Sequence, residues 1–329
     1  MNEEQYPHLI ETAEPLTKNR FPIVLQLGVL SVVMLGMFGA LLFQNSQNQV
    51  AGELPPAPIM NNAATSALVP QKINEVALEA QAAYVWDVRA QRALFASNES
   101  TPLPLASITK LMTSLLSYEL IEQNETTAIS RNAILQEGSS GLRLGEKLTI
   151  ENLSWMALIS SSNDAAYELA ASVGSLLGDR DPVAQFVTGM NIKAEELGLH
   201  TLAFKNTTGL DLSASEPGAV GSAKDISFLM EHIIETHPDI LTPSQQTATR
   251  VYNTNGEYHS LENTNDILNR IPNLIGSKTG YTDLAGGNLT IAFDLGHGRP
   301  IIITVLGSTY DERFTDVLTL VAAVQRSIE

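Results

Sequence analysis

The chain contains no cysteine among its 329 residues. Disulfide bonds, thiolate metal sites, cysteine nucleophiles and a lipidated cysteine anchor are therefore excluded, and packing has to stabilise the fold. Basic residues are also scarce, because 19 Lys and Arg stand against 36 Asp and Glu, which gives a formal net charge of -17. A surface of this sign repels nucleic-acid phosphates, so we expect no nucleic-acid partner.

The six histidines lack the pattern of a helical zinc site. They lie at positions 8, 200, 232, 237, 259 and 297, and none of them belongs to an HExxH motif. We expect His232 and His237 to occupy surface positions around a helix end. The sequence therefore predicts neither a metal nor another cofactor.

One long run without charged residues lies near the N-terminus. Residues 21–43 read FPIVLQLGVLSVVMLGMFGALLF, which at about 1.5 Å per residue is long enough for a bilayer core of about 30 Å. Lys18 and Arg20 precede the run and the next basic residue is Lys72, so the positive-inside rule places the N-terminus in the cytoplasm. The run exceeds a signal-peptide core and no Ala-x-Ala site follows it. We predict an uncleaved, single-pass anchor in the cell membrane, with cleavage of this segment as the alternative.

This anchor divides the chain into four segments. Residues 1–20 form a cytoplasmic tail, residues 21–43 the transmembrane helix, and residues 44–74 a flexible linker rich in Gln, Asn, Ala and Pro. Residues 75–329 are long enough for one folded domain with its own core. The predicted orientation puts this domain on the extracytoplasmic side.

Strand patterns occur at both ends of the predicted domain. They cover residues 82–88, 92–96, 273–280, 288–293 and 301–307, and a helix from about Asp311 follows the last of them. A mainly helical middle begins with a helix at Ser107 and extends to about residue 270. This order predicts an α+β fold with a central antiparallel sheet formed by both ends of the domain. Helices flank the sheet, and a helical subdomain is inserted.

Ser107 and Lys110 are three residues apart at the start of the predicted helix. Their hydroxyl and amine therefore project from the same side, within about 6 Å of each other. A lysine can serve as the base for a serine nucleophile when burial, a second cation or the helix N-terminus disfavours its ammonium form. Ser-x-x-Lys also arises by chance, but no other lysine of this chain follows a serine at that spacing.

Two further polar motifs follow along the chain. Ser161 and Asn163 lie in a polar break between two apolar helical stretches, where helix capping by Asp164 is an equally compatible interpretation. Residues 278–280 (KTG) end a predicted strand. Their lysine and threonine can bind a carboxylate, and the glycine permits close approach of a ligand backbone. An ordinary strand-end lysine would explain this last motif if it stood alone.

Together, these motifs carry a family resemblance. Residues 107–110, 161–163 and 278–280 stand in the order found in serine D,D-peptidases and serine β-lactamases. The surrounding sequence is similar to that of the low-molecular-weight D-alanyl-D-alanine carboxypeptidases, which are penicillin-binding proteins. The similar segments are LPLASITKLMT, SSNDAA, NTTGLD, SAKDIS and SKTGYTD. The resemblance covers about residues 76–329 and implies a β-lactamase/D,D-peptidase-like catalytic domain.

The resemblance also implies a role for each motif residue. Ser107 would be the acylated nucleophile, Lys110 its base, and Ser161 a proton carrier to the leaving amine. The backbone N–H groups of Ser107 and Tyr281 would form the oxyanion hole. Asn163 would hold the substrate amide, and Lys278 and Thr279 would bind the terminal carboxylate. The implied substrate-binding residues are Asn163, Lys278, Thr279, Gly280 and Tyr281.

The function implied by the resemblance is that of a serine-type D-Ala-D-Ala carboxypeptidase. It would act on peptidoglycan stem peptides through an acyl-enzyme on Ser107, with β-lactams as covalent inhibitors. A D,D-endopeptidase on cross-links, a serine β-lactamase and a non-catalytic peptidoglycan-binding protein are the alternatives. The β-lactamase class with a glutamate base requires Glu four residues before Asn between the second and third motifs, and no Glu satisfies this spacing. We expect no extra C-terminal domain after the last helix.

Overall fold

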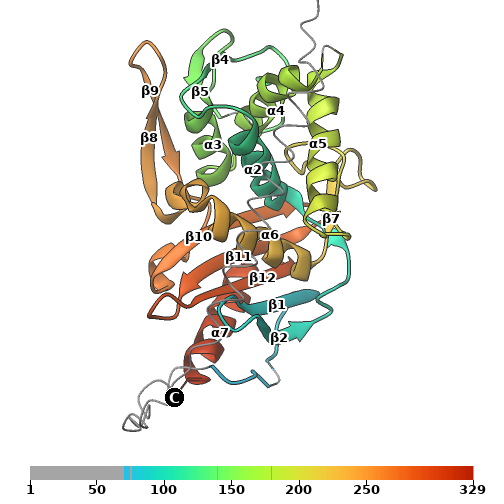
Figure 1. The fold of residues 1–329 in the computed structure, drawn as a ribbon, viewed down its shortest axis with the longest axis vertical. Coiled ribbons are helices and arrows are strands. Elements are labelled where there is room, and N and C mark those ends of the chain that lie inside the picture. Colours follow the sequence, from blue (N-terminus) through green and yellow to red (C-terminus); the bar gives the residue numbers. More distant parts are fainter. Residues whose placement is uncertain (1–69, 75, 139, 179, 329) are drawn as a thin grey trace, which may run out of the picture. The chain divides into compact units, whose positions relative to one another are not determined.

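The computed structural model describes residues 70–328, except positions 75, 139 and 179 (Figure 1). The predicted anchor, residues 21–43, lies outside the described residues, as do the predicted tail and most of the predicted linker. Among the residues that are described, no helix has both the length and the apolar character needed to cross a membrane.

A five-stranded antiparallel sheet lies at the centre of the domain (Figure 1). Its order is β10-β11-β12-β1-β2, and the strands are β1 (Ala82–Asp87), β2 (Arg92–Ser97), β10 (Leu274–Thr282), β11 (Gly286–Asp294) and β12 (Pro300–Ser308). The first strand pairs with the last, with Val85 opposite Ile303. The predicted α+β fold, with one sheet formed from both ends of the domain, is confirmed.

Helices cover both faces of this sheet. Successive residues of a strand point to opposite faces, so Trp86 and Val85 of β1 belong to two different apolar clusters. Helix α6 (Ala223–Thr236) packs on the face of Trp86, and α7 (Glu312–Arg326) packs on the face of Val85. Coverage of both faces explains why β1 is buried at every position.

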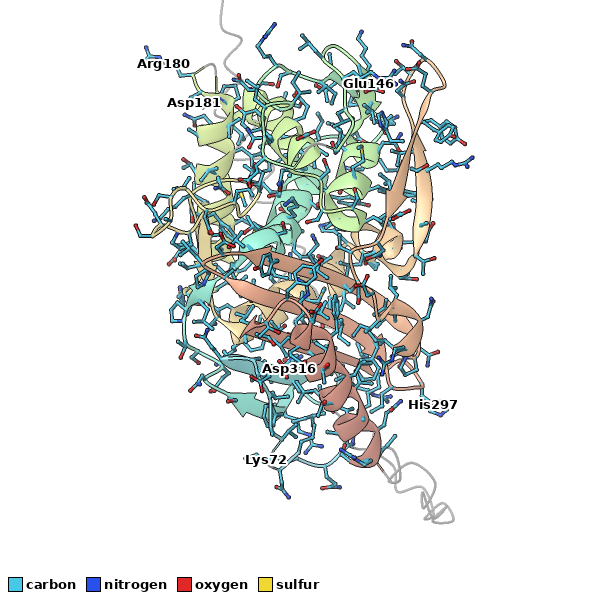
Figure 2. All side chains as sticks on the ribbon, turned by 180° about the vertical axis from the view of Figure 1, so that it is seen from behind. Lys72, Glu146, Arg180, Asp181, His297 and Asp316 are labelled. Atoms are coloured by element: carbon cyan, nitrogen blue, oxygen red, sulfur yellow. The ribbon has the colours of Figure 1, made fainter. Side chains whose placement is uncertain are left out.

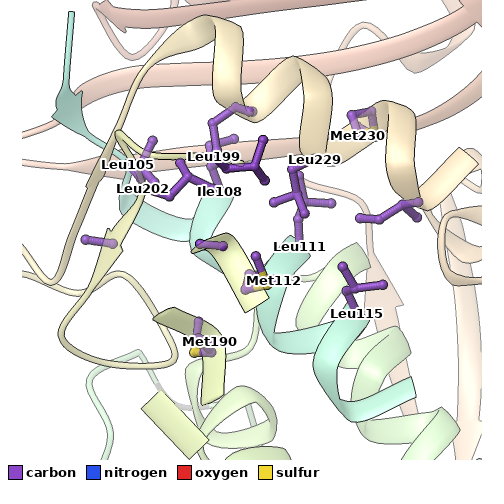
Figure 3. Packing of buried hydrophobic residues seen from close by; sticks show 14 of the residues in the cluster. Leu105, Ile108, Leu111, Met112, Leu115, Met190, Leu199, Leu202, Leu229 and Met230 are labelled. Atoms are coloured by element: carbon purple, nitrogen blue, oxygen red, sulfur yellow. The ribbon is translucent and has the colours of Figure 1, made fainter. Parts of the chain in front are cut away.

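A helical subdomain is inserted between the two halves of the sheet. Its helices are α2 (Lys110–Leu120), α3 (Ile150–Ile159), α4 (Asn163–Leu177) and α5 (Pro182–Glu196). Helix α2 contacts α3, α4, α5 and α6. Figure 3 shows Leu111, Met112 and Leu115 of α2 pointing into a cluster that includes Leu229 of α6. Helix α2 is therefore fixed on several sides, and so is its N-terminal end.

The middle of the chain also contains short strands, which the prediction of a mainly helical segment missed. They are β3 (Leu103–Pro104), β4 (Thr126–Ala128), β5 (Lys147–Thr149), β6 (Ala203–Phe204), β7 (Ala219–Gly221), β8 (Ala248–Tyr252) and β9 (Tyr258–Glu262). The described residues also form 3-10 turns, which are η3 (Ala106–Thr109), η4 (Pro238–Ile240), η5 (Thr242–Gln245) and η6 (Leu268–Arg270). The hairpin of β8 and β9 closes through the side chain of Asn253, which accepts from the backbone N–H groups of Asn255 and Glu257.

The described chain is hydrogen-bonded to the domain from its first residues. The backbone N–H of Gln71 donates to the carbonyl of Ser327 at 3.0 Å, and that of Ile73 donates to Leu94 at 2.8 Å. Asp316 of α7, labelled in Figure 2, accepts from two successive backbone N–H groups, those of residues 79 and 80. Positions 71 and 73, which the sequence analysis assigned to the linker, thus contact the domain.

Two of the histidines lie close to one carboxylate. His232 and His237, expected at the surface around a helix end, lie within and just after α6 and are partly buried. Their Nε2 atoms are 3.9 and 3.7 Å from the carboxylate of Glu119, which also pairs with Lys193 at 2.7 Å. Over the described part of the chain, no three His, Asp or Glu side chains are arranged to hold a metal.

Candidate active site

A 3-10 turn, η3, presents Ser107 at the start of α2. The helical structure begins at Ala106, one residue before the predicted start, and continues into α2 at Lys110. Ala106 has a φ of 48°, a left-handed conformation that costs a non-glycine residue roughly 1–3 kcal/mol. Its carbonyl accepts from the hydroxyl of Thr109 at 2.8 Å. Ser107 is half-buried between fully buried neighbours, so its hydroxyl is held in place and open to one side.

Lys110 is completely buried beside this hydroxyl. Its Nζ lies 2.7 Å from Ser107 Oγ, 2.7 Å from Asn163 Oδ1 and 2.9 Å from the carbonyl oxygen of Thr208. Burial lowers the pKa of Lys110 well below its ordinary value, and the charge of Lys278 lowers it further. A neutral lysine amine has two N–H groups and one lone pair. The two oxygens of Asn163 and Thr208 match the N–H groups, which leaves the lone pair for the hydroxyl of Ser107.

The polar break between α3 and α4 supplies the second hydroxyl. Ser161 has a φ of 59°, and this turn places its side chain toward Lys278. Ser162 caps α4, because its hydroxyl accepts from the backbone N–H of Ala165 at 3.0 Å. Capping by Asp164, the alternative interpretation of this motif, is therefore wrong. The carboxylate of Asp164 accepts instead from residue 140, in the segment that also meets the amide of Asn163.

Lys278 of β10 faces the polar segment between α3 and α4 that contains Ser161. It is 1% exposed, and its Nζ donates to Ser161 Oγ at 3.0 Å and to the carbonyl of Thr279 at 2.9 Å. Burial lowers the pKa of Lys278 to about 7, with a further contribution from the charge of Arg313. The hydroxyl of Thr279 lies 2.6 Å from that of Thr264. The site therefore combines a cation that is only partly charged at neutral pH with adjacent hydroxyl groups.

Gly280 allows β10 to pack against the turn that carries Ser107. A Cβ at this position would lie 2.8 Å from the carbonyl oxygen of Leu105 and 3.2 Å from the backbone nitrogen of Ile108. The close approach expected here for a ligand backbone is thus made by the chain's own turn. Tyr281, the next residue, is 47% exposed and packs edge-to-face against Tyr310. Its side chain lies at the solvent-exposed edge of the cluster.

Two groups of the site were missed by sequence reasoning. The carbonyl of Thr208 belongs to no side-chain motif, although the text NTTG marks a turn at this place. Arg313 of α7 is buried and donates to the carbonyl of Gly280 at 3.0 Å. The only signal for Arg313 in the sequence is a basic residue in the first turn of a predicted helix. Its charge helps to keep Lys278 partly neutral.

The arrangement can perform one kind of chemistry directly. A hydroxyl and a buried amine are in contact at Ser107 and Lys110, and a second hydroxyl, that of Ser161, contacts the amine of Lys278. The charge of Lys278 also lowers the pKa of Lys110, which connects the two pairs in one cluster. Such a site suits acyl transfer to serine from a substrate that carries a negative charge near its reacting carbonyl.

Comparison with known proteins agrees with this geometry. The sequence pattern of the family described as D-alanyl-D-alanine carboxypeptidase matches residues 67–309. D-alanyl-D-alanine carboxypeptidase DacF of Bacillus subtilis is 30% identical over 253 residues, which are 75% of this chain and 62% of that protein. The chain thus spans less than two thirds of the length of this relative. D-alanyl-D-alanine endopeptidase of Pseudomonas aeruginosa is 28% identical over 235 residues, 70% of this chain and 71% of that protein.

A solved structure shows the same fold. Penicillin-binding protein D2 from Listeria monocytogenes, crystallised in an ampicillin-bound form, superposes with a TM-score of 0.64 at 30% identity. The match covers 76% of this chain and 98% of the Listeria chain. The family match covers well over half of the sequence and includes all three motifs of the site. The chain therefore belongs to the D-alanyl-D-alanine carboxypeptidase family.

Proposed function

We propose that this chain is a serine-type D-Ala-D-Ala carboxypeptidase that removes the terminal D-alanine from peptidoglycan stem peptides. One observation carries the proposal: the fully buried amine of Lys110 lies 2.7 Å from the hydroxyl of Ser107. Because burial lowers the pKa of Lys110, the neutral amine is available to take the hydroxyl proton. The names of the relatives support the choice of substrate.

In the proposed reaction, Ser107 Oγ attacks the carbonyl carbon of the penultimate D-alanine while Lys110 takes its proton. The carbonyl oxygen becomes an oxyanion, which the backbone N–H groups of Ser107 and Tyr281 stabilise. The C–N bond then breaks, and the proton is returned through Ser161 to the nitrogen of the departing D-alanine. Water, activated by Lys110, cleaves the acyl-enzyme and restores the hydroxyl.

Lys278 and Thr279 are proposed to bind the terminal carboxylate of the substrate. A buried ammonium next to hydroxyl groups is a strong partner for a carboxylate, because charge-assisted hydrogen bonds exceed neutral ones. Asn163, which already accepts from Lys110, would place the substrate amide beside the reacting serine. The site thus selects peptides that end in a free carboxylate.

The pH dependence of kcat/KM follows from the two lysines. Below the pKa of Lys110 its amine is protonated and cannot act as a base, so kcat/KM falls on the acid side. The lowered pKa places this fall well below the ordinary lysine range. Above a pH of about 7, Lys278 loses its charge in the free enzyme, and kcat/KM for a peptide with a free carboxylate falls again. A profile that falls only near pH 10.4, the approximate pKa of an ordinary lysine, would contradict this assignment.

Cleavage of D,D-cross-links is the second candidate, because the Pseudomonas relative is named an endopeptidase. The full chain in detergent can be incubated separately with a stem pentapeptide and with a cross-linked muropeptide dimer. The masses of the products are then measured by mass spectrometry. Loss of one alanine from the pentapeptide supports the carboxypeptidase. Conversion of the dimer to monomers, with the pentapeptide intact, would replace this proposal by the endopeptidase.

β-Lactams are proposed to acylate Ser107 as substrate mimics, in keeping with the ampicillin-bound form of the Listeria protein. A fluorescent penicillin separates the remaining alternatives. A stable adduct supports the peptidase, rapid turnover supports a serine β-lactamase, and the absence of any labelling supports a non-catalytic peptidoglycan-binding protein.

The anchor and the location of the domain are part of the proposal. Residues 21–43 would cross the cell membrane once, and Lys18 and Arg20 support a cytoplasmic N-terminus. The catalytic domain would then face the peptidoglycan. Protease added outside spheroplasts should remove the domain and spare the N-terminal tail, whereas protection of the domain would overturn this orientation.

A further inference from the structure

A turn at residues 206–209 is held by two side chains: that of Asn206, and that of Thr208, whose hydroxyl accepts from the backbone N–H of Leu210 at 3.2 Å. The Oδ1 atom of Asn206 accepts from the backbone N–H groups of Thr208 at 3.2 Å and Gly209 at 2.7 Å. The Nδ2 atom of the same side chain donates to the carbonyl of Leu210 at 2.8 Å. Asn206 Oδ1 also accepts from the hydroxyl of Thr208 at 3.3 Å. Asn206 thus binds the backbone on both sides of the turn, and its loss would release all four contacts.

This turn directs two backbone carbonyls at α2. The carbonyl of Thr208 accepts from Lys110 Nζ at 2.9 Å, and that of Thr207 accepts from the hydroxyl of Thr113 at 2.7 Å. Both threonines of the turn are buried. The turn therefore contacts α2 at the base itself and again one helical turn further along.

The same turn also packs against the residue before the nucleophile. Gly209 has a φ of +81°, and a Cβ there would lie 1.8 Å from the carbonyl oxygen of Ala106. No side chain fits between the two backbones. The turn thus packs against both η3 and Lys110. A displacement of its backbone would therefore move both members of the nucleophile–base pair.

We infer that Asn206 is a positioning residue for Lys110. The inference rests on the proposed function, in which Lys110 is the base. Asn163 Oδ1 and the Thr208 carbonyl take the two N–H groups of the neutral amine, and this orients the lone pair toward Ser107 Oγ. Asn163 is fixed by α4, whereas the Thr208 carbonyl is fixed by the turn that Asn206 holds. Without that side chain the carbonyl of Thr208, one of the two acceptors that orient the amine, is no longer held in place by Asn206.

Asn206→Ala in the full-length chain tests this role through the rate of acylation by a fluorescent penicillin. We expect acylation at neutral pH to slow by about 10-fold or more, because general-base catalysis depends on the geometry of the proton transfer. We also expect the acid limb of the rate to move to higher pH. Water admitted by the loosened turn relieves the burial that lowers the pKa of Lys110. A purely structural role would leave the pH profile in place.

Gly218→Ala disturbs the same side chain without removing it. A Cβ at position 218 would lie 2.3 Å from Asn206 Nδ2 and 2.1 Å from the carbonyl oxygen of Leu210. This variant should show the same slowed acylation and shifted acid limb. Asn206→Ser, whose hydroxyl can accept from nearby backbone N–H groups, should recover part of the rate. Both variants keep the inference testable where Asn206→Ala fails to fold.

Asn191→Ala is the matched control. Asn191 holds Phe204 in a similar way, with Nδ2 donating to the carbonyl and Oδ1 accepting from the N–H, each at 2.9 Å. Its acylation rate should stay within about 2-fold of the wild type, because the amine geometry is preserved. Equal slowing in Asn191→Ala and Asn206→Ala, or an unchanged rate and pH profile in Asn206→Ala, would overturn the inference. Failure of the wild-type chain to be acylated at Ser107 would refute the proposed function instead.

Discussion

Replacing Lys110 by alanine is expected to slow the acylation of Ser107 by about 10²- to 10⁴-fold, the usual contribution of a general base. The amine lies 2.7 Å from the hydroxyl and has a lowered pKa, and in the proposed reaction it accepts the hydroxyl proton. Without it the serine remains a poor nucleophile. The rate of labelling by a fluorescent penicillin, followed over time at fixed pH, gives the factor directly.

Lys205→Ala provides the control for this experiment. Lys205 is a lysine of the same chain with a half-exposed side chain, paired with Glu216 at 2.8 Å. Exposed ion pairs contribute at most about 1 kcal/mol, so this variant should be labelled at the wild-type rate. A Lys110→Ala variant labelled within about 3-fold of the wild type would mean that another group serves as the base.

Replacing Lys278 by alanine is expected to lower kcat/KM by about 10²-fold for a peptide that ends in a free carboxylate. Removal of one partner of a buried charged contact costs about 2–5 kcal/mol. Lys278 is buried and has its pKa lowered to about 7, so a bound carboxylate would also restore its full charge. Steady-state kinetics on a stem peptide measure this loss.

Amidation of the peptide's C-terminus separates the two contacts of Lys278. In the wild type, amidation should remove most of the difference in kcat/KM from Lys278→Ala. In Lys278→Ala, kcat/KM should be nearly the same for the free and the amidated peptide. If kcat/KM of Lys278→Ala on the amidated peptide is still lower than that of the wild type, the remaining difference reports the contact between Lys278 and Ser161. Equal factors for amidation in both proteins would show that Lys278 does not bind the carboxylate.

Much of the sheet could be predicted from local patterns. β1 and β2 are short, rich in Val, Leu, Ala and aromatic residues, and joined by a tight turn. The three C-terminal strands are bounded by Gly and Pro. The pairing of β1 with β12 follows from strands at both ends of one compact domain. Such patterns depend on the residues themselves, so they are visible without tertiary information.

The hairpin of β8 and β9 was not predicted, although NTNG at residues 253–256 is a turn signal. Its strands are mostly exposed, with only Val251 and Leu261 buried. A strand with one buried residue lacks the alternation that distinguishes it from an exposed helix or loop. Tertiary contacts with α3 accompany the hairpin conformation.

The candidate site also contains residues that the sequence predicts and contacts that it does not predict. Ser107, Lys110 and Lys278 lie in motifs with fixed spacing, and the structure brings each of them into the polar cluster. The carbonyl of Thr208 acts through its backbone, which every residue type possesses, so no residue pattern identifies it. Arg313 comes from a helix on the other face of the sheet. Contacts of this kind arise from packing between distant segments.

Mapping the penicillin adduct by mass spectrometry tests the central claim most directly. The full chain is incubated with penicillin, digested, and the modified peptide is sequenced, alongside a Ser107→Ala variant. The opened ring of a penicillin stays attached to the acyl group and obstructs water, so the adduct should outlast many turnovers of a stem peptide. We predict an adduct on the peptide that contains Ser107 and none in the variant. An adduct on Ser161 or elsewhere, or penicillin hydrolysis as fast as that of the peptide, would contradict the account.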